Sequence, residues 1–208
     1  MRLNVAIFIF DDVEVLDFAG PFEVFAVTDD LAQQTLFNTY TVAELAGVVR
    51  ARNGLRVVPN HTFESAPVPD IIVIPGGFGT RPLLTRPLVI EWVSRQSRQA
   101  QYTVSVCTGA LLLAKAGLLD GLQVTTHHLR LDLLRELAPA ATVHADRRFL
   151  DNGKILTSAG ISAGIDVSLH LIARLCGNET AEKTAAHMEY EWKNDGGIRA
   201  GLSGGPRI

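Results

Sequence analysis

The sequence predicts an α/β fold with a mainly parallel central sheet. Strand patterns and helix patterns alternate along the chain, which is the order expected of parallel strands joined by helical crossovers. Residues 4–10 and 70–74 are almost continuously apolar, as strands buried on both faces of a parallel sheet are. The length of 208 residues suits one domain that is large enough to bury a substantial core.

Each predicted element has its own local signal. Strands are assigned to short stretches rich in β-branched and apolar residues, and helices to stretches with apolar residues every three to four positions. Pro21 stands near the start of its helix, where proline is tolerated, and Asn-Gly pairs mark two hairpin turns. In chain order we expect a strand at 4–10, a helix at 16–27, a strand at 37–43, a hairpin at 48–58, a strand at 70–74, a helix at 88–100, a strand at 102–106, a helix at 110–116, a strand at 124–126, a helix at 129–137, a strand at 141–144, a hairpin at 149–156, and helices at 165–175 and 181–192.

The composition excludes several classes of partner. The formal net charge is −3 and no basic tract occurs, so neither nucleic acid nor an anionic membrane is an expected partner. The apolar run at 5–10 ends at two aspartates and is too short for a signal peptide or a membrane span. Cys107 and Cys176 make no disulfide framework, which favours a cytoplasmic protein. No His or Cys stands at zinc spacing, and no metal or cofactor is expected.

Cys107 stands where a strand turns into a helix. Residues 102–106 read as a buried strand, residues 110–116 are strong helix formers, and Thr108 with Gly109 leaves room for a sharp turn. Such an elbow presents a side chain over the end of the sheet, and a helix N-terminus favours thiolate over thiol. The alternative is a buried structural cysteine, because free cysteine is among the most buried residue types.

Further polar groups follow other predicted strands. Asp17 comes after the first strand, Gly76 and Gly77 after the strand at 70–74, and His127 after the strand at 124–126. In an open parallel sheet the carboxyl ends of the strands share one edge, where ligands bind. We therefore expect these groups to meet Cys107 at that edge.

Each of these residues also has a structural interpretation. Asp17 is either a carboxyl of raised pKa that exchanges a proton or the N-cap of its helix. Gly76 and Gly77 offer exposed backbone N–H groups to a developing anion or only form a turn. His127 and His128 could act as base and orienter or as metal ligands, but neighbours on a strand point to opposite faces, so a shared metal is not favoured and His128 is expected to be structural.

A small-residue segment and three aromatic side chains complete the candidates. Residues 158–164, which include Gly160 and Ile161, could pass close to the site or could serve ordinary packing of a helix on the sheet. His170, His187 and Trp192 fall on predicted helical faces and are interpreted as core or surface residues.

Five motifs in order resemble the ThiJ/PfpI superfamily, over about residues 3–192. They are Leu-Asp-Phe-Ala-Gly-Pro at 16–21, Ile-Pro-Gly-Gly at 74–77, the Val-Cys-Thr-Gly elbow at 106–109, Val-Thr-Thr-His at 124–127 and Ser-Ala-Gly-Ile-Ser-Ala-Gly-Ile-Asp at 158–166. The resemblance implies a three-layer sandwich, class I glutamine amidotransferase-like and flavodoxin-like, and a homodimer. Within the superfamily the chain looks most like the isonitrile hydratase branch, and also like the sensor domains of AraC-type regulators.

The resemblance also implies roles for particular residues. Cys107 would be the nucleophile, Asp17 the acid–base partner and Thr108 a supporting residue. PfpI-type peptidases carry His directly after the nucleophile, where this chain has Thr108, so proteolysis is not expected. The regulators add a helix-turn-helix region, which a chain that stops at Ile208 is not expected to have.

The predicted function is therefore hydration of a small isonitrile to an N-substituted formamide. The Cys107 thiolate would attack the isonitrile carbon to give a thioimidate, and Asp17 would donate a proton and then activate water. Substrate contacts are expected from Gly76, Gly77, His127, Gly160 and Ile161. The alternatives are a redox or ligand sensor without turnover, and another cysteine hydrolase such as an amidase. The predicted domain spans residues 1–194, and the Gly-rich residues 195–208 form either a loose terminus or an arm on a partner subunit.

Overall fold

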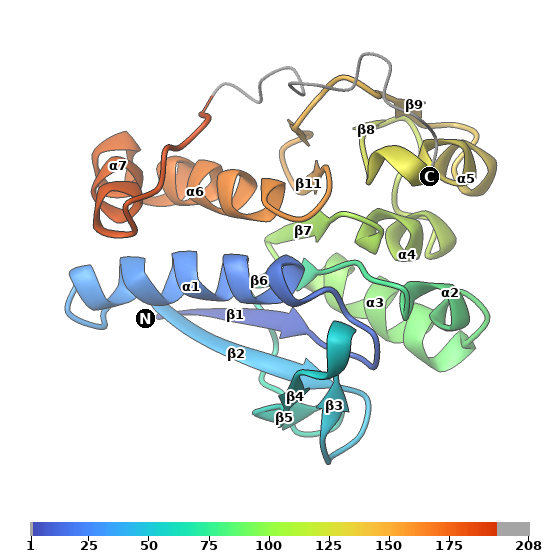
Figure 1. Ribbon diagram of the computed structural model, residues 1–208, viewed down its shortest axis with the longest axis horizontal. Coiled ribbons are helices and arrows are strands. Elements are labelled where there is room, and N and C mark those ends of the chain that lie inside the picture. The colour runs from blue at the N-terminus through green and yellow to red at the C-terminus, as the bar shows by residue number, and fades with distance from the viewer. Residues whose placement is uncertain (1, 195–208) are drawn as a thin grey trace.

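The apolar strand patterns of the sequence form the middle of a seven-stranded sheet (Figure 1). The structure is a computed structural model that describes residues 2–194. All neighbouring strands are parallel except the pair at one edge, which is antiparallel. In sheet order the strands are β10 (Phe149–Asp151), β11 (Ile155–Ser158), β7 (Tyr102–Val106), β6 (Ile71–Ile74), β1 (Leu3–Phe8), β2 (Phe37–Ala43) and β5 (His61–Thr62). The prediction of an α/β fold with a mainly parallel sheet is confirmed.

Helices cover both faces of the sheet and make it the middle of three layers. On one face, α1 (Val15–Leu31) packs along α6 (Ala163–Cys176), and α7 (Asn178–His187) contacts both. The other face carries α3 (Pro87–Gln99) and α4 (Gly109–Lys115), which contact each other, while α2 (Thr80–Leu83) and α5 (Leu131–Leu137) pack against α4. Figure 1 shows α1 and α6 running side by side and α2, α3, α4 and α5 gathered at the other end of the molecule.

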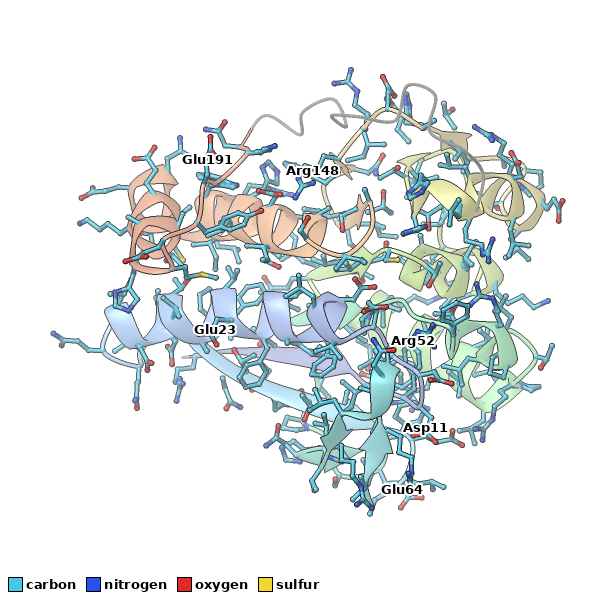
Figure 2. The ribbon with its side chains drawn as sticks, viewed as in Figure 1. Asp11, Glu23, Arg52, Glu64, Arg148 and Glu191 are labelled. Carbon is cyan, nitrogen blue, oxygen red and sulfur yellow. The ribbon has the colours of Figure 1, made fainter. Side chains whose placement is uncertain are left out.

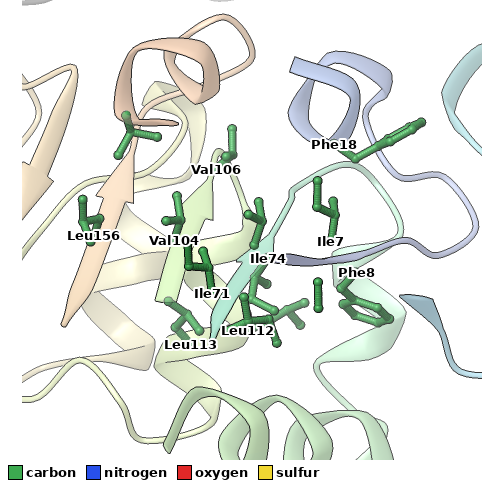
Figure 3. Packing of buried hydrophobic residues seen from close by; sticks show 14 of the residues in the cluster. Ile7, Phe8, Phe18, Ile71, Ile74, Val104, Val106, Leu112, Leu113 and Leu156 are labelled. Atoms are coloured by element: carbon green, nitrogen blue, oxygen red, sulfur yellow. The ribbon is translucent and has the colours of Figure 1, made fainter. Parts of the chain in front are cut away.

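The core lies where the parallel strands meet these helices (Figure 3). Ile7 of β1, Ile74 of β6 and Val104 of β7 are fully buried in adjacent strands. Leu112 and Leu113 of α4 pack beneath them and are also fully buried. Every residue of β6 is buried, as its continuously apolar sequence predicts for a strand with helices on both faces.

Two small sheets lie outside the central one. β3 (Val49–Arg50) and β4 (Arg56–Val57) form the predicted hairpin around Arg52–Gly54, with Asn53 at φ 60°. β8 (Gln123–Val124) pairs with β9 (Thr142–Val143) in parallel. β8 is therefore not a strand of the central sheet. Hydrogen bonds that involve side chains, and not strand pairing, attach it to the central sheet.

The end of the chain departs from the prediction in one respect. α7 ends at His187, so Trp192 does not lie on a helix as expected. Its indole Nε1 donates to the carbonyl oxygen of Asp166, and the Lys193 N–H donates to Asp166 Oδ1 at 3.0 Å. These bonds fix the non-helical segment after α7 against Asp166 of α6. The predicted Gly-rich tail, 195–208, lies outside the described residues. Among residues 2–194, no helix has the length and apolar character needed to cross a membrane.

Candidate active site

The Cys107 elbow is formed as predicted, between β7 and α4. Cys107 has φ 56°, in the left-handed region that a side chain with a Cβ seldom adopts. Its N–H donates to the carbonyl oxygens of Ser158 and Ala159, at 3.2 and 3.0 Å, which fixes the turn against the end of β11. The residue is 6% exposed, yet its side chain lines a pocket. It is thus buried like a structural cysteine and also accessible to a small molecule.

Asp17 is fully buried in the first turn of α1. Glu14 occupies the N-cap, so the alternative interpretation of Asp17 as the cap of this helix is wrong. Asp17 Oδ2 accepts the Gly76 N–H at 3.0 Å, while the buried Oδ1 has no hydrogen bond of ordinary geometry within residues 2–194. Burial raises the pKa of Asp17 to about 7, helped by the charge of Glu14 and opposed by the Gly76 N–H and by Cys107. The predicted rise in pKa is therefore supported by the geometry.

The Cys107 thiol and the Asp17 carboxyl form one buried acid–base pair. Burial raises the pKa of Cys107 well above its usual range, and the nearby Asp17 charge raises it further. The backbone N–H groups of Thr108 and Ile161 act in the opposite direction but are the smaller effects. The predicted effect of the helix N-terminus, which favours thiolate, is outweighed here, because burial and Asp17 raise the Cys107 pKa more than the Thr108 N–H lowers it. The pair instead retains a proton near neutrality.

Thr108 and the two glycines form a closed hydrogen-bond network next to the pair. The Gly77 N–H donates to Thr108 Oγ1 at 2.9 Å, and the hydroxyl in turn donates to the Gly77 carbonyl oxygen. With the Gly76 N–H bound to Asp17, neither glycine offers the exposed donor that was predicted. A side chain at Gly76 would place its Cβ 2.5 Å from the Thr108 nitrogen, so this position requires the bare backbone. The N–H groups that do face the sulfur are those of Thr108 and Ile161.

His127 and the loop before α6 form the opposite wall. Thr126 Oγ1 donates to the Cys107 carbonyl oxygen at 2.7 Å, which joins the segment after β8 to the elbow. His127 Nδ1 accepts the Leu129 N–H, and a Cβ at Gly160 would lie only 2.4 Å from the His127 ring. Ile161 has φ 55°, and its N–H faces both Asp17 and Cys107.

His127 and His128 do not diverge as predicted. Their ring centroids are 4.3 Å apart, because the strand has ended and His128 begins a 3-10 turn (His128–Arg130). Within residues 2–194, no group of three or more His, Cys, Asp and Glu side chains is arranged to hold a metal ion.

These walls enclose a pocket of about 120 Å³. That is below the ~300–1,000 Å³ usual for drug-sized ligands, so the pocket suits a small molecule. The pocket is lined by five of the predicted site residues: Gly77, Cys107, Thr108, His127 and Ile161. The other three, Asp17, Gly76 and Gly160, do not line it. The sequence reasoning missed five lining residues: Glu14, Phe78, Arg81, Leu129 and Arg130. Phe78 directly follows Gly77 and could have been found by extending the strand-end argument one residue; the two arginines carry no such signal.

Comparison with known proteins assigns the chain to a family. Residues 3–174 match the model of the DJ-1/PfpI family. The chain belongs to the DJ-1/PfpI family. It is 36% identical over 190 residues to the isonitrile hydratase of Pseudomonas putida. The matched region covers 91% of this chain and 79% of that protein. It is 29% identical over 188 residues to the HTH-type transcriptional regulator GbdR of Pseudomonas aeruginosa, of which the match covers only 51%.

Solved structures of DJ-1/PfpI proteins share the fold. A ThiJ/PfpI family protein from Pseudomonas syringae superimposes with a TM-score of 0.83 at 28% identity, over 93% of this chain and 77% of that one. Oxidised DJ-1 of Toxoplasma gondii gives a TM-score of 0.78 at 21% identity, over 92% of this chain and all of that one. The expected membership of the ThiJ/PfpI superfamily is confirmed. Because relatives include both an enzyme and transcriptional regulators, membership alone does not assign a reaction.

Proposed function

We propose that this protein is a cysteine-dependent hydratase that converts a small isonitrile and water to an N-substituted formamide. The observation that carries the proposal is the buried pair of Asp17 and Cys107 at the base of a small pocket. The Asp17 carboxyl interacts with the Cys107 side chain, which lines the pocket, so it can exchange a proton with the reacting centre at the sulfur. The similarity to an isonitrile hydratase over 91% of the chain supports the same reaction.

The first step adds the thiol across the isonitrile carbon. The Cys107 sulfur forms a bond to that carbon, and the proton held by the Cys107–Asp17 pair moves to the same carbon. The product of this step is an S-linked thioimidate, Cys107–S–CH=N–R. Since the pair retains a proton near neutrality, the attacking sulfur and the proton donor are present together without an external acid.

The second step hydrolyses the thioimidate. Asp17, now a carboxylate, accepts a proton from water as the water oxygen bonds to the thioimidate carbon, and it passes this proton to the substrate nitrogen. The carbon–sulfur bond then breaks, the formamide R–NH–CHO leaves, and the second water proton returns to the Cys107–Asp17 pair. The Thr108 and Ile161 N–H groups facing the sulfur stabilise negative charge on it as the bond forms and breaks.

A direct test compares two cysteine variants in a screen of simple alkyl isonitriles, with formamide production followed by proton NMR. Cys107→Ser is expected to lose at least a hundredfold in turnover, since loss of a nucleophile costs several orders of magnitude. Cys176→Ser is the matched control, because Cys176 lies at the end of α6 outside the pocket, and it is expected to keep its activity. Retention of more than a hundredth of the activity by Cys107→Ser would refute the nucleophile role.

A second candidate function is ligand sensing without turnover, and the similarity to regulators supports it. The raised pKa of Cys107 argues against the redox form of this alternative, because oxidation requires thiolate character. In the sensing case an isonitrile or formamide would bind with no product formed, so binding measured by calorimetry in the absence of turnover separates the two.

We also propose that the protein acts as a homodimer, on the basis of family resemblance. Sedimentation equilibrium at micromolar concentration is expected to give twice the monomer mass of 22.5 kDa. A mass near the monomer value would contradict the proposal.

A further inference from the structure

The mouth of the Cys107 pocket carries a group of arginines that the proposed reaction does not use. Arg81 of α2 and Arg130, at the end of the turn after His127, both line the pocket. Arg52, labelled in Figure 2, stands on the 3-10 turn between β3 and β4. Arg52 and Arg81 lie over the same Phe78 ring, with Cζ atoms 3.9 and 4.3 Å from its centroid. Three segments far apart in sequence thus bring positive charge to one opening.

Among the described residues, these three arginines have no acidic partner. Within residues 2–194, no Asp or Glu oxygen lies within ion-pair distance of Arg52, Arg81 or Arg130, whereas other arginines such as Arg86 and Arg148 have carboxylate partners. The charges act on one another: the pKa of Arg81 is lowered by burial and then by Arg130 and Arg52. Unpaired like charges in a partly buried place cost free energy, and a bound anion would remove that cost.

The positive charge is close to the reacting sulfur. A Cys107 thiolate would raise the pKa of Arg81, so the two groups are within electrostatic range. The only carboxylate lining the pocket among the described residues is Glu14. Its charge raises the pKa of Asp17, so it acts on the acid–base pair. The pocket therefore has an acid–base end and a cationic end.

We infer that the substrate of this pocket carries a carboxylate, which Arg81 binds with help from Arg130 while the reacting group points to Cys107. The planar guanidinium matches a carboxylate in a paired hydrogen-bond geometry. A pocket of about 120 Å³ leaves room for only a few non-hydrogen atoms between the two ends. A monoanion is favoured over a dianion because Glu14 shares the pocket. On the proposed function, on which this inference rests, the substrate class is that of short isocyano carboxylic acids and the product class that of N-formyl amino acids.

The test has a binding arm and a turnover arm. In the binding arm, calorimetry compares N-formylglycine with its methyl ester, which has the same skeleton without the charge. The acid is expected to bind roughly 10- to 100-fold more tightly, the effect of one hydrogen bond to a charged group. Arg81→Gln should abolish most of this preference, and Arg81→Lys should keep part of it. Arg98→Gln, which removes an exposed arginine of α3 outside the pocket, is the matched control and should keep all of it.

In the turnover arm, kcat/KM is measured for isocyanoacetate and for methyl isocyanoacetate with the same variants. The same preference for the acid, lost in Arg81→Gln, would support the inference. Turnover of the ester with no preference for the acid would overturn the inference and leave the hydratase proposal standing. A preference for the acid in binding with no turnover of either isonitrile would support the carboxylate site and overturn the hydratase proposal. Circular dichroism and thermal melting of each variant identify any loss of fold.

Discussion

Replacing Asp17 by Asn should change the pH dependence of stability in a calculable way. Burial raises the pKa of Asp17 from its ordinary value of 3.8 to about 7 in the folded chain. The folded chain therefore holds a proton that the unfolded chain has lost between about pH 4 and pH 7, and wild-type stability falls as pH rises through that window. At about 1.36 kcal/mol per unit the full effect is about 4 kcal/mol. Asn cannot ionise, and its amide oxygen can still accept the Gly76 N–H. The free energy of unfolding of the variant should therefore not fall in this pH window.

The measurement is urea unfolding of wild type and Asp17→Asn at pH 5, 6, 7 and 8, at one protein concentration. The free energy of unfolding of the variant minus that of wild type should grow by about 2 kcal/mol between pH 5 and pH 7 and then level off. Asp120→Asn removes an exposed carboxyl outside the pocket and serves as the control for loss of one charge. A difference that stays constant from pH 5 to pH 8 would refute the conclusion that desolvation governs Asp17.

Three further predictions concern neighbouring residues. Gly160→Ala should push the His127 ring from the Cys107 pocket and destabilise the fold by about 1–3 kcal/mol; a thermal melt and a kcat/KM value both equal to wild type would count against this packing. Arg148→Met should cost about 3–5 kcal/mol in a urea titration, because it leaves the fully buried Asp166 carboxylate without its cationic partner, and a loss below 1 kcal/mol would exclude that role for the ion pair. Casein and fluorogenic peptides should show no cleavage above a Cys107→Ser control, because Thr108 supplies no base; cleavage lost in both Cys107→Ser and His127→Ala would instead indicate a peptidase.

The fold could be predicted from the sequence because its signals are local. The strands at 37–43 and 102–106 have the predicted bounds, since β-branched residues and buried positions coincide there. The last helix could not be bounded in this way. Apolar residues continue at helical spacing to Trp192, but hydrogen bonds to Asp166 hold the segment in a non-helical conformation. Such tertiary bonds leave no trace in hydrophobic periodicity.

The site was predictable in its location and less so in its chemistry. Cys107 and Asp17 meet because parallel strands end at one edge of the sheet, which a pattern of alternating elements already implies. The protonation of the pair was not predictable, because it depends on how completely the sulfur is buried, and burial depends on residues distant in sequence, such as Ile161. The arginines of the mouth were missed for a related reason: nothing in the sequence near Arg52, Arg81 or Arg130 says that they converge.

The acid–base pair is completed by segments that lie far apart along the chain. Asp17, Gly76, Cys107 and Ile161 come from four different parts of the sequence, and the Ile161 loop is the last of them to leave the ribosome. Until that loop docks, Cys107 is an ordinary solvated thiol with a pKa near 8.5, open to alkylation and oxidation. Completing the fold thus both assembles the reactive centre and shields its thiol from general reagents. A molecule in which that loop has not docked is therefore expected to be alkylated at Cys107 faster than the folded protein, in which the residue is 6% exposed.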